Sequence, residues 1–266
     1  MIQKRRLLGA WCALMVWGSA SAQNDVPLGL ALAPNVSHGI SRDYSHEPIE
    51  AAVRFGYQFI FDWKFTDTYA IGSGVNVFHT GGYIEHYAVT DTARVGYVKW
   101  GVRNQYVEVP LTFKMRTKEI GYTTYYGQFG LGLGINVRAE VDERTAPAWS
   151  QDSTGHWTPI VLDLGDADPL RKNFEANTRF FRPALIVGLG AERSLLGKTA
   201  ICMGLTYNMG LANQFTDLEI VRTNTSGLPV DASGAYIATE GTVTEPDAVN
   251  MKGKTGFLQF SVGLMF

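Results

Sequence analysis

The chain lacks any long apolar run and has only two cysteines among its 266 residues. Beyond the first 22 residues, no stretch approaches the ~20 consecutive apolar residues of a transmembrane helix. We therefore exclude a helical membrane anchor in the rest of the chain. The cysteines are Cys12 and Cys202. Because Cys12 lies in a segment that we expect to be removed, the exported chain keeps one cysteine and cannot form an internal disulfide.

Positive charge is also scarce. The chain carries 23 Lys and Arg against 25 Asp and Glu. Removing Lys4, Arg5 and Arg6 with the leader leaves 20 basic against 25 acidic residues, a formal charge of −5. A nucleic-acid-binding surface needs an excess of basic side chains, so this balance argues against nucleic acid as a partner.

The N-terminal segment has the pattern of a signal peptide. Residues 4–6 are basic, residues 7–17 form an apolar stretch, and the small residues Ala-Ser-Ala at 20–22 suit a cleavage site. We therefore expect residues 1–22 to be a signal peptide. Residues 23–266, which are 244 residues long, are expected to form one domain of the exported protein.

In the exported chain, bulky apolar side chains recur at every second position in eight stretches. In the clearest stretch, 53–65, these side chains are Val, Phe, Tyr, Phe, Phe, Trp and Phe, and most residues between them are polar or glycine. Successive side chains of a strand point to opposite faces, so each stretch has one apolar and one polar face. The predicted strands are residues 28–37, 52–64, 68–79, 104–116, 122–140, 178–192, 199–212 and 256–266.

The connections between these strands alternate in length. Three are short, at 65–67, 117–119 and 193–198, and four are long. Outer-membrane barrels have an even number of strands, short periplasmic turns and long extracellular loops. We therefore predict an all-β protein, a single eight-stranded antiparallel up-and-down transmembrane β-barrel of the bacterial outer membrane. The long connections are residues 39–51, 80–103, 141–177 and 213–255.

The alternation alone does not decide which face looks inward. A soluble lipocalin-like barrel would bury the apolar face, and its water-facing side would then carry Gly130, Gly132 and Gly134 in one strand. Exposed strand faces normally carry Thr, Lys and Glu, whereas a narrow eight-stranded interior suits glycine beside a few long side chains. The membrane orientation is therefore favoured. The predicted lipid-facing residues are Phe59, Phe61, Leu111, Phe113, Leu131, Leu133, Val187, Leu205 and Phe260.

The opposite parity holds charged residues of both signs. Buried charges must pair or they destabilise the fold by several kcal/mol, so we predict an internal network with Glu108 and Arg182 as the central pair. Paired long side chains would fill the lumen, which argues against an open pore. The predicted lumen network consists of Arg54, Glu108, Lys114, Arg116, Arg138, Arg182 and Glu192.

Three segments make the chain similar to a known family. They are Tyr-Val-Glu-Val-Pro-Leu at 106–111, Gly-Gln-Phe-Gly-Leu-Gly-Leu-Gly at 127–134, and the closing strand 256–266. With a leader that ends before Gln23, they resemble the PorT-like outer-membrane β-barrel proteins of Bacteroidota-type bacteria over essentially the whole exported chain. The resemblance implies the barrel architecture and no catalytic residue. The terminal Phe266 looks like the signal that the barrel-assembly machinery reads during insertion.

The family resemblance also raises an alternative role. The family name comes from a component of a secretion and gliding apparatus, so the resemblance implies a possible accessory component of such a machine. The predicted partners are outer-membrane lipid, the barrel-assembly machinery during insertion, and an extracellular or secretion-machine protein.

Polar loop residues suggest two metal hypotheses. Histidine is the commonest metal ligand, and all five histidines fall at the predicted outer rim or in long loops, but no pair has a tight ligand spacing. Asp163, Asp166 and Asp168 lie within six residues and carboxylates suit Ca²⁺, but they do not match an EF-hand loop. Such residues are common in solvated loops, so no metal or other cofactor is predicted. The histidines are His38, His46, His79, His86 and His156.

A barrel enzyme would need a nucleophile or a positioned base at the rim. The candidates are His79 and His86 with Glu85, or His38 with Ser37. Neither set forms a recognisable motif, and such sites assemble in space and not in sequence. We therefore expect a non-enzymatic barrel whose extracellular loops present a binding or interaction surface. An outer-membrane enzyme and a small-solute channel are the alternatives. Trp149 and Trp157 would either contact a partner or glycan, or pack within their loop to cap the barrel.

Overall fold

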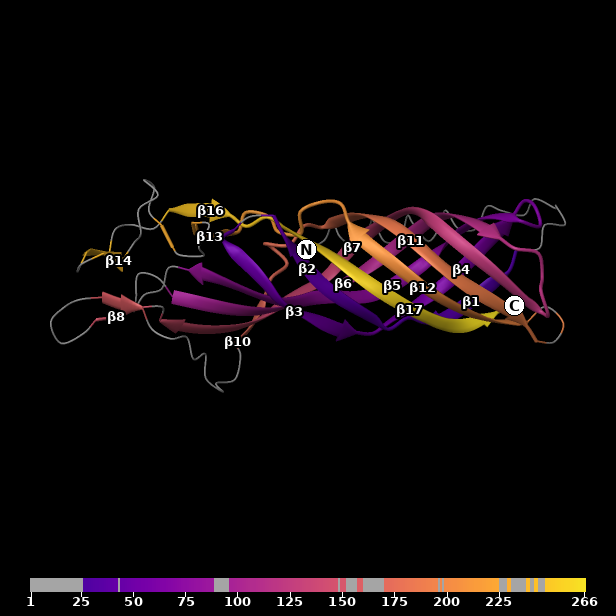
Figure 1. Ribbon diagram of the computed structural model, residues 1–266, viewed down its shortest axis with the longest axis horizontal. Coiled ribbons are helices and arrows are strands. Elements are labelled where there is room, and N and C mark those ends of the chain that lie inside the picture. Colours follow the sequence, from indigo (N-terminus) through magenta and orange to yellow (C-terminus); the bar gives the residue numbers. More distant parts are fainter. Residues whose placement is uncertain are drawn as a thin grey trace, which may run out of the picture.

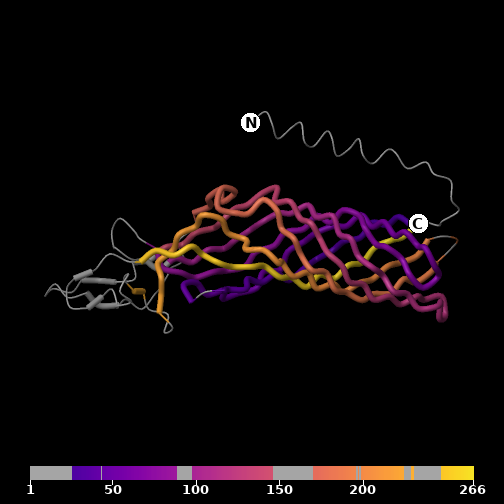
Figure 2. The backbone as a smooth tube through the Cα atoms, turned by 90° about the horizontal axis from the view of Figure 1, so that it is seen from above, coloured from indigo at the N-terminus to yellow at the C-terminus, as the bar shows by residue number. Residues whose placement is uncertain are grey.

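The computed structural model is an elongated β-barrel whose strands run obliquely to the long axis (Figure 1). The short turns and the C-terminus lie at one end, and the longer connections lie at the other (Figure 2). No helix among the described residues is long and apolar enough to cross a membrane. The structure describes residues 26–42, 44–88, 96–147, 149–151, 157–159, 170–195, 197, 199–224, 229–230, 238–239, 242–243 and 247–266. The predicted signal peptide, residues 1–22, lies outside them.

The strands of the barrel wall occupy eight positions around a closed ring, which confirms the predicted eight-stranded antiparallel barrel. The last wall strand pairs with its predecessor on one side and with both parts of the first wall on the other, so the sheet has no open edge there. Two walls are each divided into two strands. In chain order the wall strands are β1 (Leu28–Leu32) and β2 (Asn35–Ser41), β3 (His46–Arg54) and β4 (Gly56–Lys64), β5 (Tyr69–Ala88), β6 (Gly96–Arg116), β7 (Thr123–Pro147), β11 (Phe181–Ser194), β12 (Ala200–Gly210) and β17 (Gly253–Met265).

In the part of the chain that the structure describes, seven shorter strands lie outside the ring, at the end away from the C-terminus (Figure 1). One of them, β10, extends the barrel sheet by pairing with β7. The others form three two-stranded sheets, in which β8 pairs with β9, β13 with β16, and β14 with β15. Their bounds are β8 (Trp149–Gln151), β9 (Trp157–Pro159), β10 (Leu170–Asn173), β13 (Glu219–Val221), β14 (Ala238–Thr239), β15 (Thr242–Val243) and β16 (Ala248–Asn250).

The three predicted short turns are present, at residues 65–68, 117–122 and 195–199. The turn between β6 and β7 needs a left-handed backbone at two consecutive positions, Gly121 with φ 58° and Tyr122 with φ 64°. Glycine adopts this conformation without a steric penalty. The left-handed pair therefore helps to reverse the chain tightly between two long strands.

Three of the predicted long connections are wrong in extent. β7 continues to Pro147, so the beginning of the predicted loop 141–177 belongs to a strand. β5 continues to Ala88 and β6 begins at Gly96, so most of the predicted loop 80–103 is a β-hairpin. Only residues 42–45 separate β2 from β3, so the predicted loop 39–51 is a short connection.

These strands extend because the apolar residues lie on the inner face, and the polar residues on the outer face, beyond the predicted membrane span. In the barrel, apolar side chains such as Leu111 face outward and polar ones such as Glu108 face inward. Farther along the same strand, Trp100 and Val102 are buried inside and Lys99 faces outward. A strand in water must bury its apolar face, so inward apolar residues stabilise the extension.

We call this extension the head. It comprises residues 81–88 of β5, 96–103 of β6 and 139–147 of β7, with β10, β13, β16 and the segments that pack on them. Its apolar core combines residues of β5, β6 and β7 with residues of the β7–β11 and β12–β17 connections. The buried residues of this core are Ile84, Val98, Trp100, Val102, Ala139, Val141, Phe174, Phe215, Ile220 and Met251.

Candidate functional site

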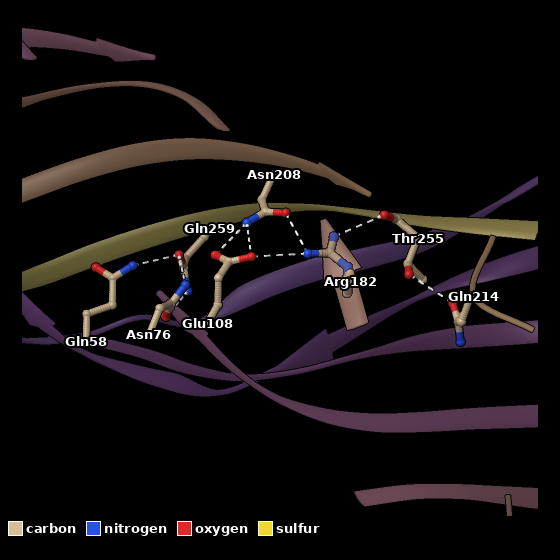
Figure 3. Close-up of polar contacts among 8 residues, drawn as sticks. All are labelled: Gln58, Asn76, Glu108, Arg182, Asn208, Gln214, Thr255 and Gln259. Carbon is tan, nitrogen blue, oxygen red and sulfur yellow. Dashed lines mark hydrogen bonds and ion pairs between the residues drawn. The ribbon is translucent and has the colours of Figure 1, made fainter. Parts of the chain in front are cut away.

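Three buried polar side chains meet in the middle of the barrel and form what we call the central cluster. They are Glu108 from β6, Arg182 from β11 and Asn208 from β12 (Figure 3). Asn208 Nδ2 donates to both carboxylate oxygens of Glu108, at 2.9 and 3.1 Å. Arg182 Nη1 donates to Asn208 Oδ1 at 2.8 Å and lies 3.4 Å from Glu108 Oε2. The cluster is thus a closed triangle in which the carboxylate has charged and neutral donors.

Aromatic rings cover the central cluster on the side of the head. Phe78, Tyr106 and Phe257 are almost fully buried and pack together, with ring centroids 5.8 Å and 4.6 Å apart for the two contacts of Phe78. The Arg182 guanidinium carbon lies 5.3 to 5.7 Å from the three ring centroids. A cation over several ring faces is stabilised by their quadrupoles. Arg182 also donates to the carbonyl of Thr255 at 3.2 Å (Figure 3).

A second group of ion pairs lies closer to the short turns. Lys114 Nζ is 2.7 Å from Asp62 Oδ1, and Arg116 holds Glu192 through two hydrogen bonds of 2.6 and 3.0 Å. We call these the turn-side pairs. All four side chains are buried or nearly so. Since Arg116, Lys114 and Glu108 follow one another along β6, the two groups occupy successive levels of the lumen.

A polar cavity of about 70 Å³ separates these two levels. Its lining includes Glu108 and Asn208 at one end, Lys114 and Tyr126 at the other, and Gln128 between them. A cavity of this size and polarity is large enough for several water molecules. The interior is therefore a stack of ion pairs around a small polar chamber.

Glycine at inward positions makes room for these long side chains. A Cβ added at Gly132 would lie 2.6 Å from the carboxyl carbon of Glu108, and one at Gly190 would lie 2.5 Å from the Tyr126 ring. Real Cβ contacts are not this short, so neither charged nor aromatic neighbour could keep its place. The inward-facing glycines and the long side chains of the lumen therefore depend on each other.

The structure brings together most, but not all, of the residues of the predicted lumen network. Glu108 with Arg182, Lys114, and Arg116 with Glu192 lie in the interior. Arg138 does not: its side chain is 63% exposed and pairs with Glu140 at 2.6 Å. A register shift between Gln105 and Tyr106 changes the parity of β7 at this point. The prediction of a lumen position for Arg138 is therefore corrected.

Two other features of the lumen differ from the sequence analysis. Arg54 is half-buried, and its Nε has no hydrogen-bond partner in the described part of the chain. Asn208 was not singled out, although it binds both members of the central pair. Its place among the inward-facing residues of β12 could have indicated it, but a search for charged residues does not detect an amide.

The predicted lipid-facing residues lie on the outer surface. Eight of them are 38% to 62% exposed, and Phe113 is partly covered by the rings of Phe65, Tyr69 and Phe129. Phe266 is exposed beside the barrel seam, where its N–H donates to Leu28 O at 2.8 Å. The eight are Phe59, Phe61, Leu111, Leu131, Leu133, Val187, Leu205 and Phe260.

The structure does not bring the candidate catalytic residues together. Glu85 and His86 are adjacent in a strand, so they point to opposite faces. His86 is buried, and its desolvation lowers its pKa to about 3, with a further contribution from His46. His79 faces outward, with Nδ1 3.1 Å from Phe55 O.

The remaining candidate ligands are either separate or outside the described residues. His38 stacks on Tyr207 at 6.3 Å between ring centroids. Among the residues that the structure describes, no group of three His, Cys, Asp or Glu side chains could hold a metal ion. His156, Asp163, Asp166 and Asp168, and the side chains of Trp149 and Trp157, lie outside the described part.

No curated protein matches the chain. Among solved structures, Neisserial surface protein A is similar with 10% identity and a TM-score of 0.40, over 90% of this chain and 97% of that chain. OprG from Pseudomonas aeruginosa is similar with 10% identity and a TM-score of 0.41, over 91% and 95%. Ail from Yersinia pestis is similar with 11% identity and a TM-score of 0.35, over 91% and 99%.

The family comparison covers most of the chain. The model described as "Outer membrane protein beta-barrel domain" matches residues 21–216. This match includes seven of the eight wall positions and the whole central cluster. The chain therefore belongs to the outer membrane protein beta-barrel domain family, and it is a small eight-stranded barrel of the bacterial outer membrane.

Proposed function

We propose that this protein is a closed, non-enzymatic barrel that anchors an extracellular head, and that the head binds a partner protein. The head itself is the observation that supports this role. Ordering residues costs conformational entropy. The buried head core lies beyond the outward-facing apolar residues that contact the bilayer, so membrane insertion alone does not explain why it is ordered. An ordered structure outside the membrane is where binding by such a barrel is expected.

The filled lumen supports the closed state. The turn-side pairs, the central cluster and the three aromatic rings occupy successive levels of the interior. The apolar core of the head then covers the outer end. An ion crossing the barrel would have to disrupt buried ion pairs and a packed core, both of which oppose opening.

The outer surface of the head suits a protein partner. Lys99 pairs with Glu50 at 3.3 Å and lies 5.0 Å from the centre of the Tyr83 ring. Asp142 pairs with both Arg103 and Arg171, at 3.2 and 2.9 Å. Aromatic and arginine side chains are the residues enriched at protein interfaces, and cross-strand pairing holds them in a fixed arrangement.

Site-specific photocrosslinking in living cells tests the proposal. A photoreactive phenylalanine analogue replaces Tyr83 on the head or, as the matched control, Tyr57 on the apolar belt; both tyrosines are exposed. We expect a discrete protein adduct from position 83 and none from position 57. Equal adducts from the two positions, or none from position 83 and from a second head position such as Tyr87, would contradict a binding head.

The identity of the adduct separates the alternatives. A subunit of a secretion or gliding machine would support the accessory role that the family resemblance implies. Liposome swelling tests closure separately: the purified barrel should admit small sugars no faster than protein-free liposomes. Rapid swelling would instead support a small-solute channel.

A further inference from the structure

Backbone hydrogen bonds join four neighbouring segments of the barrel at the end that carries the head. Arg179 N donates to Gln214 O at 2.8 Å, and Gln214 N donates to Gly253 O at 2.8 Å. On the other side of β17, Arg42 N donates to Lys252 O at 3.0 Å. The segment before β11, the β12–β17 connection, the start of β17 and the segment after β2 therefore lie side by side.

Three basic residues of these segments lie on the outer surface. Arg42 and Arg179 are exposed, and Lys254 is partly exposed. Gly253 and Thr255, on either side of Lys254, are both buried. Successive side chains of a strand point to opposite faces, so Lys254 faces outward. We call Arg42, Arg179 and Lys254 the basic row.

The basic row lies directly beyond the apolar outer surface. Val36 and Leu258 are cross-strand partners on the outside of β2 and β17, 45% and 44% exposed. The next outward ring on β2 is His38, which stacks on Tyr207 of β12 at 6.3 Å between ring centroids. Aromatic rings of this kind mark the interface between the hydrocarbon and the headgroups. Lys254 follows two positions farther from Leu258 than this interface, so the row lies at the level of the extracellular headgroups.

The charge of the basic row is not balanced by ion pairs within the described residues. None of the ion pairs between described residues involves Arg42, Arg179 or Lys254. Arg42 lies opposite Lys252 and is therefore a diagonal neighbour of Lys254 across β2 and β17, a spacing of about 7–8 Å. Like charges on adjacent strands repel each other, and an anionic partner would relieve this repulsion.

We propose that the basic row binds the phosphate groups of a lipid of the outer leaflet. Guanidinium and ammonium groups form strong, charge-assisted hydrogen bonds with phosphate. The acyl chains of the same lipid would lie against Val36 and Leu258, since the row continues the lipid-facing surface. This inference does not depend on a protein partner for the head.

Binding of diphosphorylated lipid A to the full-length refolded barrel in detergent micelles tests the proposal. The test variant replaces the whole basic row with glutamine, and the matched control removes three positive charges from β7 and β10. A basic residue beside an anionic lipid surface contributes roughly fivefold in affinity, so the test variant should bind about 100-fold more weakly and the control as the wild type does. The test variant is Arg42→Gln/Arg179→Gln/Lys254→Gln, and the control is Arg144→Gln/Arg171→Gln/Lys172→Gln.

The phosphate requirement is tested with lipid A from which both phosphates have been removed. It should bind the wild type as weakly as the phosphorylated lipid binds the test variant. Equal binding of the two lipids by the wild type would overturn the proposal. Inorganic phosphate that binds as tightly as lipid A would assign the row to a free anion and would also overturn it.

A loss of tenfold or more in the test variant, with a smaller loss in the control, supports the basic row. A loss below tenfold, or an equal loss in the control, refutes it. Gel mobility of unboiled samples shows whether each variant folds. If the test variant does not fold, Arg42→Gln and Lys254→Gln replace it singly, each with an expected loss of roughly fivefold; a loss below twofold in either variant would refute the site.

Discussion

Removing the charge of Glu108 is the most direct test of how the lumen is held together. In Glu108→Gln the side chain keeps its shape, but Arg182 is left buried without a counter-charge. Breaking one partner of a buried ion pair typically destabilises a protein by about 3–5 kcal/mol. The central cluster should follow this rule because its glutamate is completely buried.

The surroundings of Arg182 place the expected loss near the lower end of that range. Its Nη1 would still donate to Asn208 Oδ1 and its Nη2 to the carbonyl of Thr255. The three aromatic rings would still face the guanidinium. The adjoining polar cavity can also admit water to the cluster. We therefore expect Glu108→Gln to lower the free energy of unfolding by about 3 kcal/mol.

Urea unfolding in phospholipid vesicles, followed by tryptophan fluorescence and by the mobility of unboiled samples, measures this loss. The control is Glu140→Gln, which breaks a shorter ion pair, 2.6 Å against 3.4 Å, to an arginine that is 63% exposed. Exposed pairs contribute about 0–1 kcal/mol, so the control should lie close to the wild type.

A double-mutant cycle identifies the cause. Because the stranded charge produces most of the loss, Glu108→Gln combined with Arg182→Met should be more stable than the sum of the two single changes predicts. Additive losses would refute the argument. So would a value for Glu108→Gln within 1 kcal/mol of the wild type.

Three further predictions concern packing, lipid contact and pH. Gly132→Ala should destabilise the barrel by about 1–3 kcal/mol, since its Cβ would lie 2.6 Å from the glutamate of the central cluster, whereas Gly127→Ala, which meets nothing within 4 Å, should have no effect on the urea midpoint. Leu133→Arg on the lipid face should cost about 2–4 kcal/mol against about 0–1 for Tyr122→Arg at the turn end; folded fractions on unboiled gels compare them, and equal fractions would contradict the lipid-facing assignment. The pKa of His86 is about 3 in the fold and 6.5 when unfolded, so the unfolded head binds the extra proton and stability should fall as pH drops from 6.5 toward 3, by up to about 1.4 kcal/mol per pH unit. Hydrogen exchange of head amides should show this loss in the wild type but not in His86→Phe, and an equal pH dependence in both would refute it.

The barrel itself could be predicted from the sequence because lipid and a narrow lumen impose opposite demands on alternate residues. Leu111 and Leu131 are paired across β6 and β7 and both face outward, whereas Thr112 faces its partner Gly130 on the inner side. A two-residue period repeated in eight stretches has few other structural explanations. The strand number and the short turns followed from it.

The head could not be predicted in the same way. Val98, Trp100 and Val102 also alternate, but their apolar face points inward and their polar face outward. The pattern of outward-facing apolar residues holds only where lipid surrounds the barrel. In the head, which water surrounds, the same pattern is absent and the sequence predicts a loop. The side-chain period is unchanged there, and only the solvent on the outer side differs.

Single-residue irregularities set a second limit. The shift between Gln105 and Tyr106 moves Arg138 from the inner to the outer side. A bulge of this kind changes the facing of every later residue in the strand. Nothing in the neighbouring residue types announces it, because arginine is compatible with either side.

The exchange of chemistry between the two faces fixes the immersion depth of the protein. Moving the barrel two residues along its strands, about 7 Å, toward the periplasm would draw Lys99 and Glu85 toward acyl chains, and an equal movement outward would expose the belt of Leu111 and Leu131 to water. Either displacement is opposed, so the protein has one vertical position. In a bilayer of different thickness, the lipid must stretch or compress to match it.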